Sequence, residues 1–317
     1  MDDGDAENTI PTVDLSQFFS KEEEGRKLAT DTIAQACQTY GFFRIINHGV
    51  PAELMARALD LSKQFFALPD EEKHKVKPIE GSKAPLPAGY ARQPEHSKDK
   101  NEYFMVFSPD LGFNLYPDQP AEFKGVIEKC YQRLVEVASL IQEIVNNCMG
   151  LPPNFLKEYN SSRNFDFMIA LRYFPATETE NNGLSEHQDG NCITLVFQDE
   201  IGGLEILKND NWIQIEPSEG DIIVNLGDMI QVLSNNKFKS ATHRVIQKGT
   251  HRHSFAFFFS IDGEKWIEPL PQFTTNIGEP PKYRGFHYKE YMQLRMRNKT
   301  HPPSRPEDVI HIAHYSI

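Results

Sequence analysis

The segment SATHRVIQKGTHRHSFAFFF, residues 240–259, contains two runs of β-prone residues joined by a polar link. Similar runs recur through the second half of the chain, at Phe167–Phe174, Cys192–Phe197, Leu204–Leu207, Trp212–Ile215, Asp221–Asn225, His243–Val245 and Ser254–Ile261. Gly, Asn and Pro lie between them, as is typical of turns between strands. Because the runs follow one another instead of alternating with helices, they predict a double-sheet jelly roll.

The first half of the chain carries mainly helical patterns. The clearest has a period of 3.6 residues and comprises Ile127, Cys130, Leu134, Val137, Ile141, Ile144 or Val145, and Cys148. Weaker patterns predict a helix through Leu28, Ile33, Ala36 and Cys37, a helix at Glu53–Leu68, and strands at Ile10–Leu15 and Phe42–Ile46. The expected fold class is therefore α+β, with a double-stranded β-helix (jelly-roll) core and supporting helices.

Residues 73–120 fit neither pattern, because seven prolines interrupt them. A long irregular segment of this kind is typical of a flap over a site, so we expect a substrate lid here. The predicted organisation is an amino-terminal mixed α/β region with this flap at 1–120 and a helix plus jelly-roll core at 121–317, joined in one compact unit. Tyr283–Arg297 is predicted to form a carboxy-terminal helix that either closes the barrel mouth or simply packs on it.

Composition excludes some classes of partner. The formal charge of −12 repels phosphate backbones and anionic lipid, so neither nucleic acid nor a membrane surface is expected as a partner. Met1–Asn8 lacks the features of a secretory signal, and no stretch has the length of a membrane span. The four cysteines are widely spaced and predicted to be free thiols, which favours a cytoplasmic location. Nothing in the sequence indicates an oligomeric state.

Two histidines and an aspartate form the principal candidate site. His187 and Asp189 are two residues apart, so an extended chain directs both to the same side, and His243 opens a later β-prone run. Two His and one carboxylate form the facial triad that holds Fe(II) and leaves positions open for a bidentate co-substrate and O2. His-x-Asp also occurs in ordinary surface loops, and His243 in its β context strengthens the metal interpretation.

Arg252 and Ser254 form a second candidate site nine residues beyond His243. They would share one face of a strand, where a guanidinium and a hydroxyl can bind the distal carboxylate of a dicarboxylate. The alternative is a surface arginine on an edge strand. By the same alternation, Phe257 and Phe259 should face away from Arg252 and pack in the core.

Several motifs in this chain resemble those of the plant 2-oxoglutarate- and Fe(II)-dependent dioxygenases, which include flavonoid, gibberellin and auxin oxidases. They are Ile10–Asp14, Gly41–Pro51, Gly202–Glu205, Val224–Asp228, Ser234–Asn236 and His243–Val245. The resemblance covers nearly the whole chain. It implies iron on His187, Asp189 and His243, and 2-oxoglutarate on Arg252 and Ser254. It further implies oxidation of a small organic metabolite, most simply its hydroxylation, by O2 with release of succinate and CO2, and ascorbate as reductant.

Three positions depart from the family pattern. Phe174 stands where relatives have the tyrosine before proline that helps to hold the co-substrate, the interval from His243 to Arg252 is one residue short, and the Ser-Asn-Gly turn reads Ser234–Asn236. Arg172 or Tyr173 could offset the lost hydroxyl, and we predict Tyr173 as a co-substrate ligand. Asn236 can adopt the left-handed turn conformation in place of glycine.

Two other functions stay open: a catalytically silent jelly-roll binding protein, in which Phe174 and the shortened interval spoil co-substrate docking, and an Fe(II) oxidase that uses no 2-oxoglutarate. A zinc hydrolase is disfavoured, because the sequence places no general base beside the triad. The lesser candidates are residues for which a structural or surface role competes with a role in the site: His48 in a turn, His251 and His253 beside Arg252, and His96, Tyr103 and Phe104 in the flap.

Overall fold

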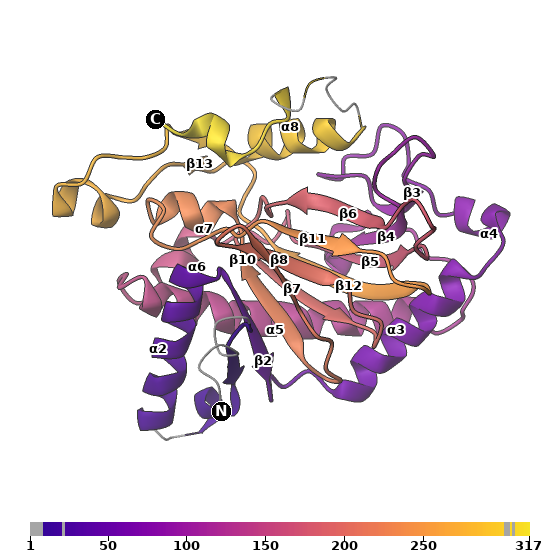
Figure 1. Cartoon of the computed structure of the whole chain (residues 1–317), viewed down its shortest axis with the longest axis horizontal. Coiled ribbons are helices and arrows are strands. Elements are labelled where there is room, and N and C mark those ends of the chain that lie inside the picture. The colour runs from indigo at the N-terminus through magenta and orange to yellow at the C-terminus, as the bar shows by residue number, and fades with distance from the viewer. Residues whose placement is uncertain (1–8, 21–22, 301–304, 306–307) are drawn as a thin grey trace.

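The computed structural model describes residues 9–20, 23–300, 305 and 308–317. Within these residues an eight-stranded sheet has the order β1-β2-β10-β7-β12-β5-β4-β3, a four-stranded sheet the order β6-β11-β8-β9, and β13 pairs with β14. The strands are β1 Thr12–Asp14, β2 Phe42–Ile46, β3 Gly89–Arg92, β4 Asn101–Phe107, β5 Phe167–Tyr173, β6 Asn182–His187, β7 Ile193–Gln198, β8 Leu204–Lys208, β9 Asn211–Gln214, β10 Ile222–Leu226, β11 His243–Ile246, β12 Arg252–Phe259, β13 Trp266–Ile267 and β14 Phe286–His287. The two larger sheets form the predicted double-sheet jelly roll (Figure 1).

The helices are α1 Ser16–Phe19, α2 Glu23–Thr39, α3 Ala52–Phe66, α4 Asp70–His74, α5 Phe123–Cys148, α6 Phe155–Tyr159, α7 Asp228–Leu233 and α8 Tyr288–Thr300. Of these, α2, α3 and α5 supply most of the cover on the side of the larger sheet away from the smaller one, whereas α8 lies beside the space between the sheets. Short 3₁₀ turns occur at Pro109–Leu111, Pro271–Phe273, Thr275–Ile277 and Ile312–Tyr315. No helix in the described part of the chain is long and apolar enough to cross a membrane.

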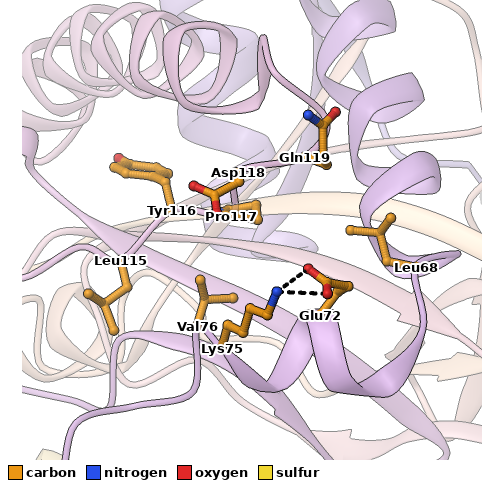
Figure 2. Close-up of a pocket in the computed structure, with 9 residues that line it drawn as sticks. All are labelled: Leu68, Glu72, Lys75, Val76, Leu115, Tyr116, Pro117, Asp118 and Gln119. Carbon is orange, nitrogen blue, oxygen red and sulfur yellow. Dashed lines mark hydrogen bonds and ion pairs between the residues drawn. The ribbon is translucent and has the colours of Figure 1, made fainter.

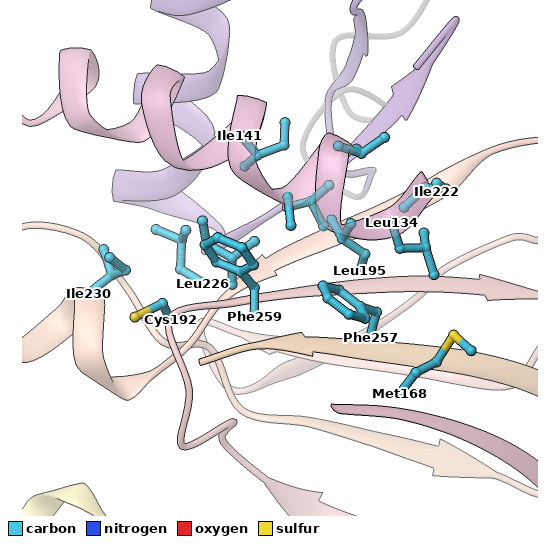
Figure 3. Close-up of a cluster of buried hydrophobic side chains, with 14 of the residues drawn as sticks. Leu134, Ile141, Met168, Cys192, Leu195, Ile222, Leu226, Ile230, Phe257 and Phe259 are labelled. Atoms are coloured by element: carbon cyan, nitrogen blue, oxygen red, sulfur yellow. The ribbon is translucent and has the colours of Figure 1, made fainter. Parts of the chain in front are cut away.

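The predicted long helix is confirmed as α5, and its buried face forms the centre of the core. Leu134 and Ile141 of α5 pack with Leu195 of β7 and with Phe257 and Phe259 of β12 (Figure 3). Each such fully buried side chain contributes roughly 1.5–3 kcal/mol. The alternation along β12 is as predicted, because Phe257 and Phe259 enter this core while Arg252 and Ser254 face the space between the sheets.

Three predictions need correction. The segment 73–120 is not irregular throughout, because it contains β3 and β4, which extend the larger sheet beyond β5. Strand β6 was missed, since its sequence Asn182–His187 has little apolar content for the buried-strand pattern to detect. Leu28 is 70% exposed, because the buried face of α2 contains Ala29, Ile33, Ala36 and Cys37 and position 28 lies on the opposite side.

The amino-terminal region shares a sheet with the core. Strand β2 pairs with β10, and β1 adds to β2 in parallel, so residues 12–46 contribute directly to the jelly roll. The proposed boundary near residue 120 therefore divides the sequence but not the sheet, and it stays a prediction. The Ser234–Asn236 turn behaves as expected, since Asn235 and Asn236 have φ of 50° and 72°. Residues 1–8, on which the expectation about a secretory signal depends, lie outside the described residues.

Candidate metal and co-substrate site

The structure brings His187, Asp189 and His243 together at one end of the barrel. His187 ends β6 and His243 begins β11, and the two are register partners in the smaller sheet. Asp189 Oδ1 lies 3.6 Å from His187 Nε2 and 3.8 Å from His243 Nε2. One ligand atom from each residue falls within 4.8 Å of the others. This donor set on one side of a cavity fits an Fe(II) facial triad.

Hydrogen bonds from the surrounding residues orient all three ligands. His187 Nδ1 lies 2.8 Å from the Ser185 carbonyl oxygen and His243 Nδ1 lies 3.1 Å from that of Ala241, so donation from each Nδ1–H makes Nε2 the nitrogen whose lone pair can bind a metal. Asp189 Oδ2 accepts hydrogen bonds of 2.7 Å from Thr194 Oγ1 and from Asn225 Nδ2. These bonds occupy Oδ2 and leave Oδ1 directed toward the histidines. Thr194 and Asn225 were not identified from sequence, although Asn225 belongs to the Val224–Asp228 motif.

The surroundings of Asp189 favour the ionised form of its carboxyl group. Burial by itself would raise the pKa of its carboxyl group, but His243, His187 and the two hydrogen bonds outweigh burial and lower the pKa to about 2. An ionised carboxylate between two imidazoles is the form that binds a divalent cation.

Arg252 lies in the same cavity and is only 2% exposed. Its Nη1 donates to Ser254 Oγ at 3.1 Å and its Nη2 donates to Gln198 Oε1 at 2.6 Å, while its buried Nε has no partner among the described residues. No carboxylate in the described part of the chain forms an ion pair with this guanidinium. A buried cation without an acid partner carries a large desolvation cost, so the pocket is suited to a carboxylate ligand such as that of 2-oxoglutarate.

Tyr173 completes the arginine end of the cavity, whereas Arg172 and Phe174 lie outside it. Tyr173 is the register partner of Arg252, whose guanidinium carbon is 4.7 Å from the centre of the tyrosine ring. Burial raises the pKa of Tyr173, while hydrogen bonds with Arg252 and Ser254 oppose that rise. Phe174 instead lies 5.5 Å from Arg172, measured from ring centre to guanidinium carbon. Of Arg172 and Tyr173, Tyr173 is therefore the one whose side chain lies beside Arg252 and Ser254.

These groups line one cavity of about 420 Å³, a size typical of small-molecule sites. Its polar end contains the triad and Arg252. Its other walls come from the segment before β3, from β4, β5 and β12, and from the carboxy-terminal helix, and they include Leu86, Tyr103, Met105, Phe167, Ile169, Phe258, Met292 and Met296. Tyr103 was one of the flap candidates, and it lines the cavity from β4.

The carboxy-terminal helix α8 closes one side of this cavity, which gives it more than a packing role. Its Arg295 donates to the carbonyl oxygen of Gln188, between two metal-ligand candidates, and at 2.7 Å to Asp228 Oδ2. Asp228 in turn donates its backbone N–H to the carbonyl oxygen of Asp189 at 2.7 Å. Helix α8, in yellow in Figure 1, is thus tied directly to the turn that carries Asp189. Sequence patterns gave no signal for Arg295.

The remaining candidates lie away from the triad. His48 is a turn residue, with Nε2 2.9 Å from the Gly220 carbonyl oxygen. His253 is directed to Asp199 Oδ2 at 3.3 Å, and His251 to the carbonyl oxygen of Tyr173 at 3.4 Å. Phe104 is in the helix-side core, and His96 is exposed.

A second cavity, of about 180 Å³, lies between α4 and residues 115–119 (Figure 2). Its residues are distant in sequence from the triad and Arg252. Of its three charged residues, Glu72 and Lys75 pair with each other at 2.7 Å and Asp118 is the third; Tyr116 forms part of its wall. The described residues that line it form no cluster of metal-ligand side chains. We therefore assign the chemistry to the larger cavity.

Comparison with known proteins agrees with this arrangement. Residues 165–261 match the family model of the 2OG-Fe(II) oxygenase superfamily, and residues 10–126 match that of the non-haem dioxygenase in morphine synthesis N-terminal region. Flavonol synthase/flavanone 3-hydroxylase of Matthiola incana is 30% identical over 304 residues, which cover 92% of this chain and 100% of that protein. Hyoscyamine 6-dioxygenase of Hyoscyamus niger is 33% identical over 311 residues, covering 92% and 87%.

Known structures show the same fold. The structure of JOX2 in complex with 2OG, Fe and JA superposes with a TM-score of 0.80 at 28% identity, covering 95% of this chain and 88% of that one. A full-length Neurospora crassa protein in complex with alpha-KG gives a TM-score of 0.81 at 24% identity, covering 90% and 95%. The predicted jelly-roll fold is confirmed by these similarities.

Proposed function

This chain belongs to the 2OG-Fe(II) oxygenase superfamily, and we propose that its iron is held by His187, Asp189 and His243. The protein is a 2-oxoglutarate-dependent dioxygenase that acts on a small metabolite. The observation that carries the residue assignment is the convergence of two Nε2 atoms and one carboxylate oxygen in one cavity. The same cavity contains Arg252, which has no acid partner among the described residues.

Arg252, Ser254 and Tyr173 are the proposed ligands of 2-oxoglutarate. The guanidinium would bind the distal carboxylate, the Ser254 and Tyr173 hydroxyls would add hydrogen bonds, and the 2-oxo-acid end would then face the triad. When bound, iron with 2-oxoglutarate and O2 supplies the oxidising power, one oxygen atom going to succinate and the other to the substrate.

The chain itself contributes orientation and exclusion of water. Ser185 and Ala241 hold the imidazoles, Thr194 and Asn225 hold the carboxylate, and α8 covers the turn at Asp189. Hydroxylation is the proposed outcome, because a C–H bond placed beside the metal is the simplest acceptor of the oxygen atom.

Ascorbate is the proposed reductant that returns iron to the Fe(II) state after turnover without substrate. We also propose a cytoplasmic location. Its support is that all four cysteines are free, three of them buried, as is usual for proteins of reducing compartments.

The assignment is tested by calorimetric titration of 2-oxoglutarate into anaerobic protein loaded with Mn(II), which stands in for Fe(II). Arg252→Met should weaken this binding by about 10- to 100-fold, the value of a charge-assisted hydrogen-bonded pair. The matched control is Arg244→Met, because Arg244 pairs with Glu205 at 2.8 Å outside the cavity.

Release of succinate in air with Fe(II) distinguishes the rival functions. Unchanged 2-oxoglutarate affinity in Arg252→Met would refute the co-substrate assignment. Iron-loaded protein that binds 2-oxoglutarate but never releases succinate would indicate a silent binding protein, and substrate oxidation without 2-oxoglutarate would indicate an independent oxidase.

A further inference from the structure

The part of the large cavity away from Arg252 is apolar. Leu86, Met105, Phe167, Ile169, Phe258 and Met296 line it and belong to one side-chain cluster. Phe167 and Phe258 stack with ring centres 4.5 Å apart and planes inclined by 16°. Phe258 is the register partner of Thr194, which bonds Asp189, so this aromatic wall is level with the triad. A substrate placed beside the metal therefore meets aromatic and thioether surface, which favours a ring.

Three arginines among the described residues line the cavity, Arg92, Arg252 and Arg295, and none offers its guanidinium to a charged substrate. The Arg92 guanidinium lies with Glu102 on the opposite face of the sheet. Arg252 belongs to the co-substrate end. All three nitrogens of Arg92 are used, with Nε 3.0 Å from Glu102 Oε2 and Nη1 and Nη2 3.2 and 2.9 Å from the Asp70 carboxylate. Arg295 is held by Asp228 and the Gln188 carbonyl oxygen.

The cavity offers no acid to a cationic substrate either. Among the described residues that line it, the one carboxylate is that of Asp189, which the metal would engage. An ionised group of either sign would thus lose its water without gaining a partner, and this cost is much larger than that of burying a neutral group.

One polar group remains for recognition of a neutral substrate. Tyr103 lines the cavity from β4, opposite Leu171 of β5, and no hydrogen bond joins its hydroxyl to a described residue. Burial alone raises the pKa of Tyr103, so the hydroxyl stays protonated and able to donate. Gln93 also lines the cavity, but its backbone bond to Asn101 places it in the row of Tyr173, at the co-substrate end.

We propose that the substrate is a neutral, mainly apolar, ring-bearing metabolite with a hydrogen-bond acceptor that faces the Tyr103 hydroxyl. This inference rests on the proposed function, because it takes the Arg252 end of the cavity to be occupied by 2-oxoglutarate. It predicts that the substrate carries no ionised group, so that free acids and amines are not good substrates.

Four probes of nearly the same size test the charge rule: methyl cinnamate, cinnamate, cinnamylamine and trans-β-methylstyrene. Each is titrated by calorimetry into anaerobic protein already loaded with Mn(II) and 2-oxoglutarate. Methyl cinnamate should bind at least about 10-fold more tightly than cinnamate or cinnamylamine, because only the ions bury an unpaired charge. Equal or tighter binding of either ion would overturn the proposal, and so would a failure of both neutral probes to bind.

Tyr103→Phe tests the hydrogen bond. It should weaken binding of methyl cinnamate by about 2- to 10-fold and leave that of trans-β-methylstyrene, which lacks an acceptor, unchanged. The matched control is Tyr116→Phe, which removes an equivalent tyrosine hydroxyl beside the smaller cavity (Figure 2). Equal losses for both probes in Tyr103→Phe would refute the donor role.

The preceding titration of 2-oxoglutarate separates two kinds of failure. If 2-oxoglutarate does not bind, the proposed function fails. If it binds and depends on Arg252, but the probes rank by charge in another order, only the substrate class is wrong.

Discussion

Two buried charged clusters lie on opposite faces of the same strands and differ in how their charges are satisfied. Tyr173 and Asn101 share a register position with Arg252 on the cavity face, and their chain neighbours Arg172 and Glu102 pair with each other on the opposite face. Arg252 has no acid partner among the described residues. Glu102, which is 0% exposed, has several basic partners.

The cluster around Glu102 contains its own counter-charges. Oε2 accepts from Tyr90 Oη at 2.6 Å and Arg92 Nε at 3.0 Å, with Lys73 Nζ at 3.5 Å, and Oε1 lies 2.5 Å from Arg172 Nη2. These contacts join α4, β3, β4 and β5. A self-contained cluster stabilises the fold, whereas a cluster short of one charge is prepared for a ligand.

The largest expected effect is that of Asp189→Ala on turnover. Succinate release should fall to less than about one thousandth, because the metal's contribution of several kcal/mol requires its carboxylate ligand. The metal-free variant should still fold but unfold at a somewhat lower temperature, because His243, His187 and two hydrogen bonds lower the pKa of Asp189 and its carboxylate therefore stabilises the folded chain at neutral pH. Iron content and unfolding temperature are measured against Asp31→Ala on the exposed face of α2, and wild-type turnover in Asp189→Ala would refute the metal assignment.

The next effect is on stability. Glu102→Gln leaves three basic side chains without their shared acid, so the free energy of unfolding should fall by about 3–5 kcal/mol. Urea denaturation gives this value. If the variant kept its stability but lost affinity for 2-oxoglutarate, the contrast between the clusters would be wrong.

Arg252→Met should not lower the free energy of unfolding as Glu102→Gln does. It removes a buried cation that lacks an acid partner among the described residues, so ligand-free protein should be as stable as the parent or more so in the same urea experiment. The stabilisation that 2-oxoglutarate adds to the parent should shrink, because the ligand now binds weakly. A loss of ligand-free stability similar to that of Glu102→Gln would show that Arg252 is structural.

The smallest effects concern the two aromatic neighbours. Tyr173→Phe should weaken 2-oxoglutarate binding by about 2- to 10-fold through loss of one hydroxyl. Phe174→Tyr should leave the affinity within about twofold, because position 174 is not on the cavity face. Calorimetry on the Mn(II) protein measures both, and an improvement in Phe174→Tyr would show that both positions reach the ligand.

Spacing and alternation in the sequence were sufficient to predict the main helices and strands and to group the candidate site residues. The 3.6-residue period predicted α5, and the β-prone runs predicted most strands of the jelly roll. His187, Asp189, His243, Arg252 and Ser254 were proposed from residue type, spacing and family resemblance. Strands β3 and β4 escaped because prolines flank each of them, and β6 escaped because its composition is polar. Pairing with neighbouring strands, which is not a local property, stabilises all three.

Strand alternation and donor chemistry are local properties, so the sequence was enough to predict the fold class and to propose residues for metal and co-substrate, while the resemblance of several motifs to a known family supplied the reaction class. The tertiary structure was needed to show that Tyr173, and neither Arg172 nor Phe174, lies beside Arg252, since this depends on the register between β5 and β12. It alone also showed which arginines are already paired and that α8 closes the cavity. Partners distant in the chain create these properties, and no spacing along the sequence records them.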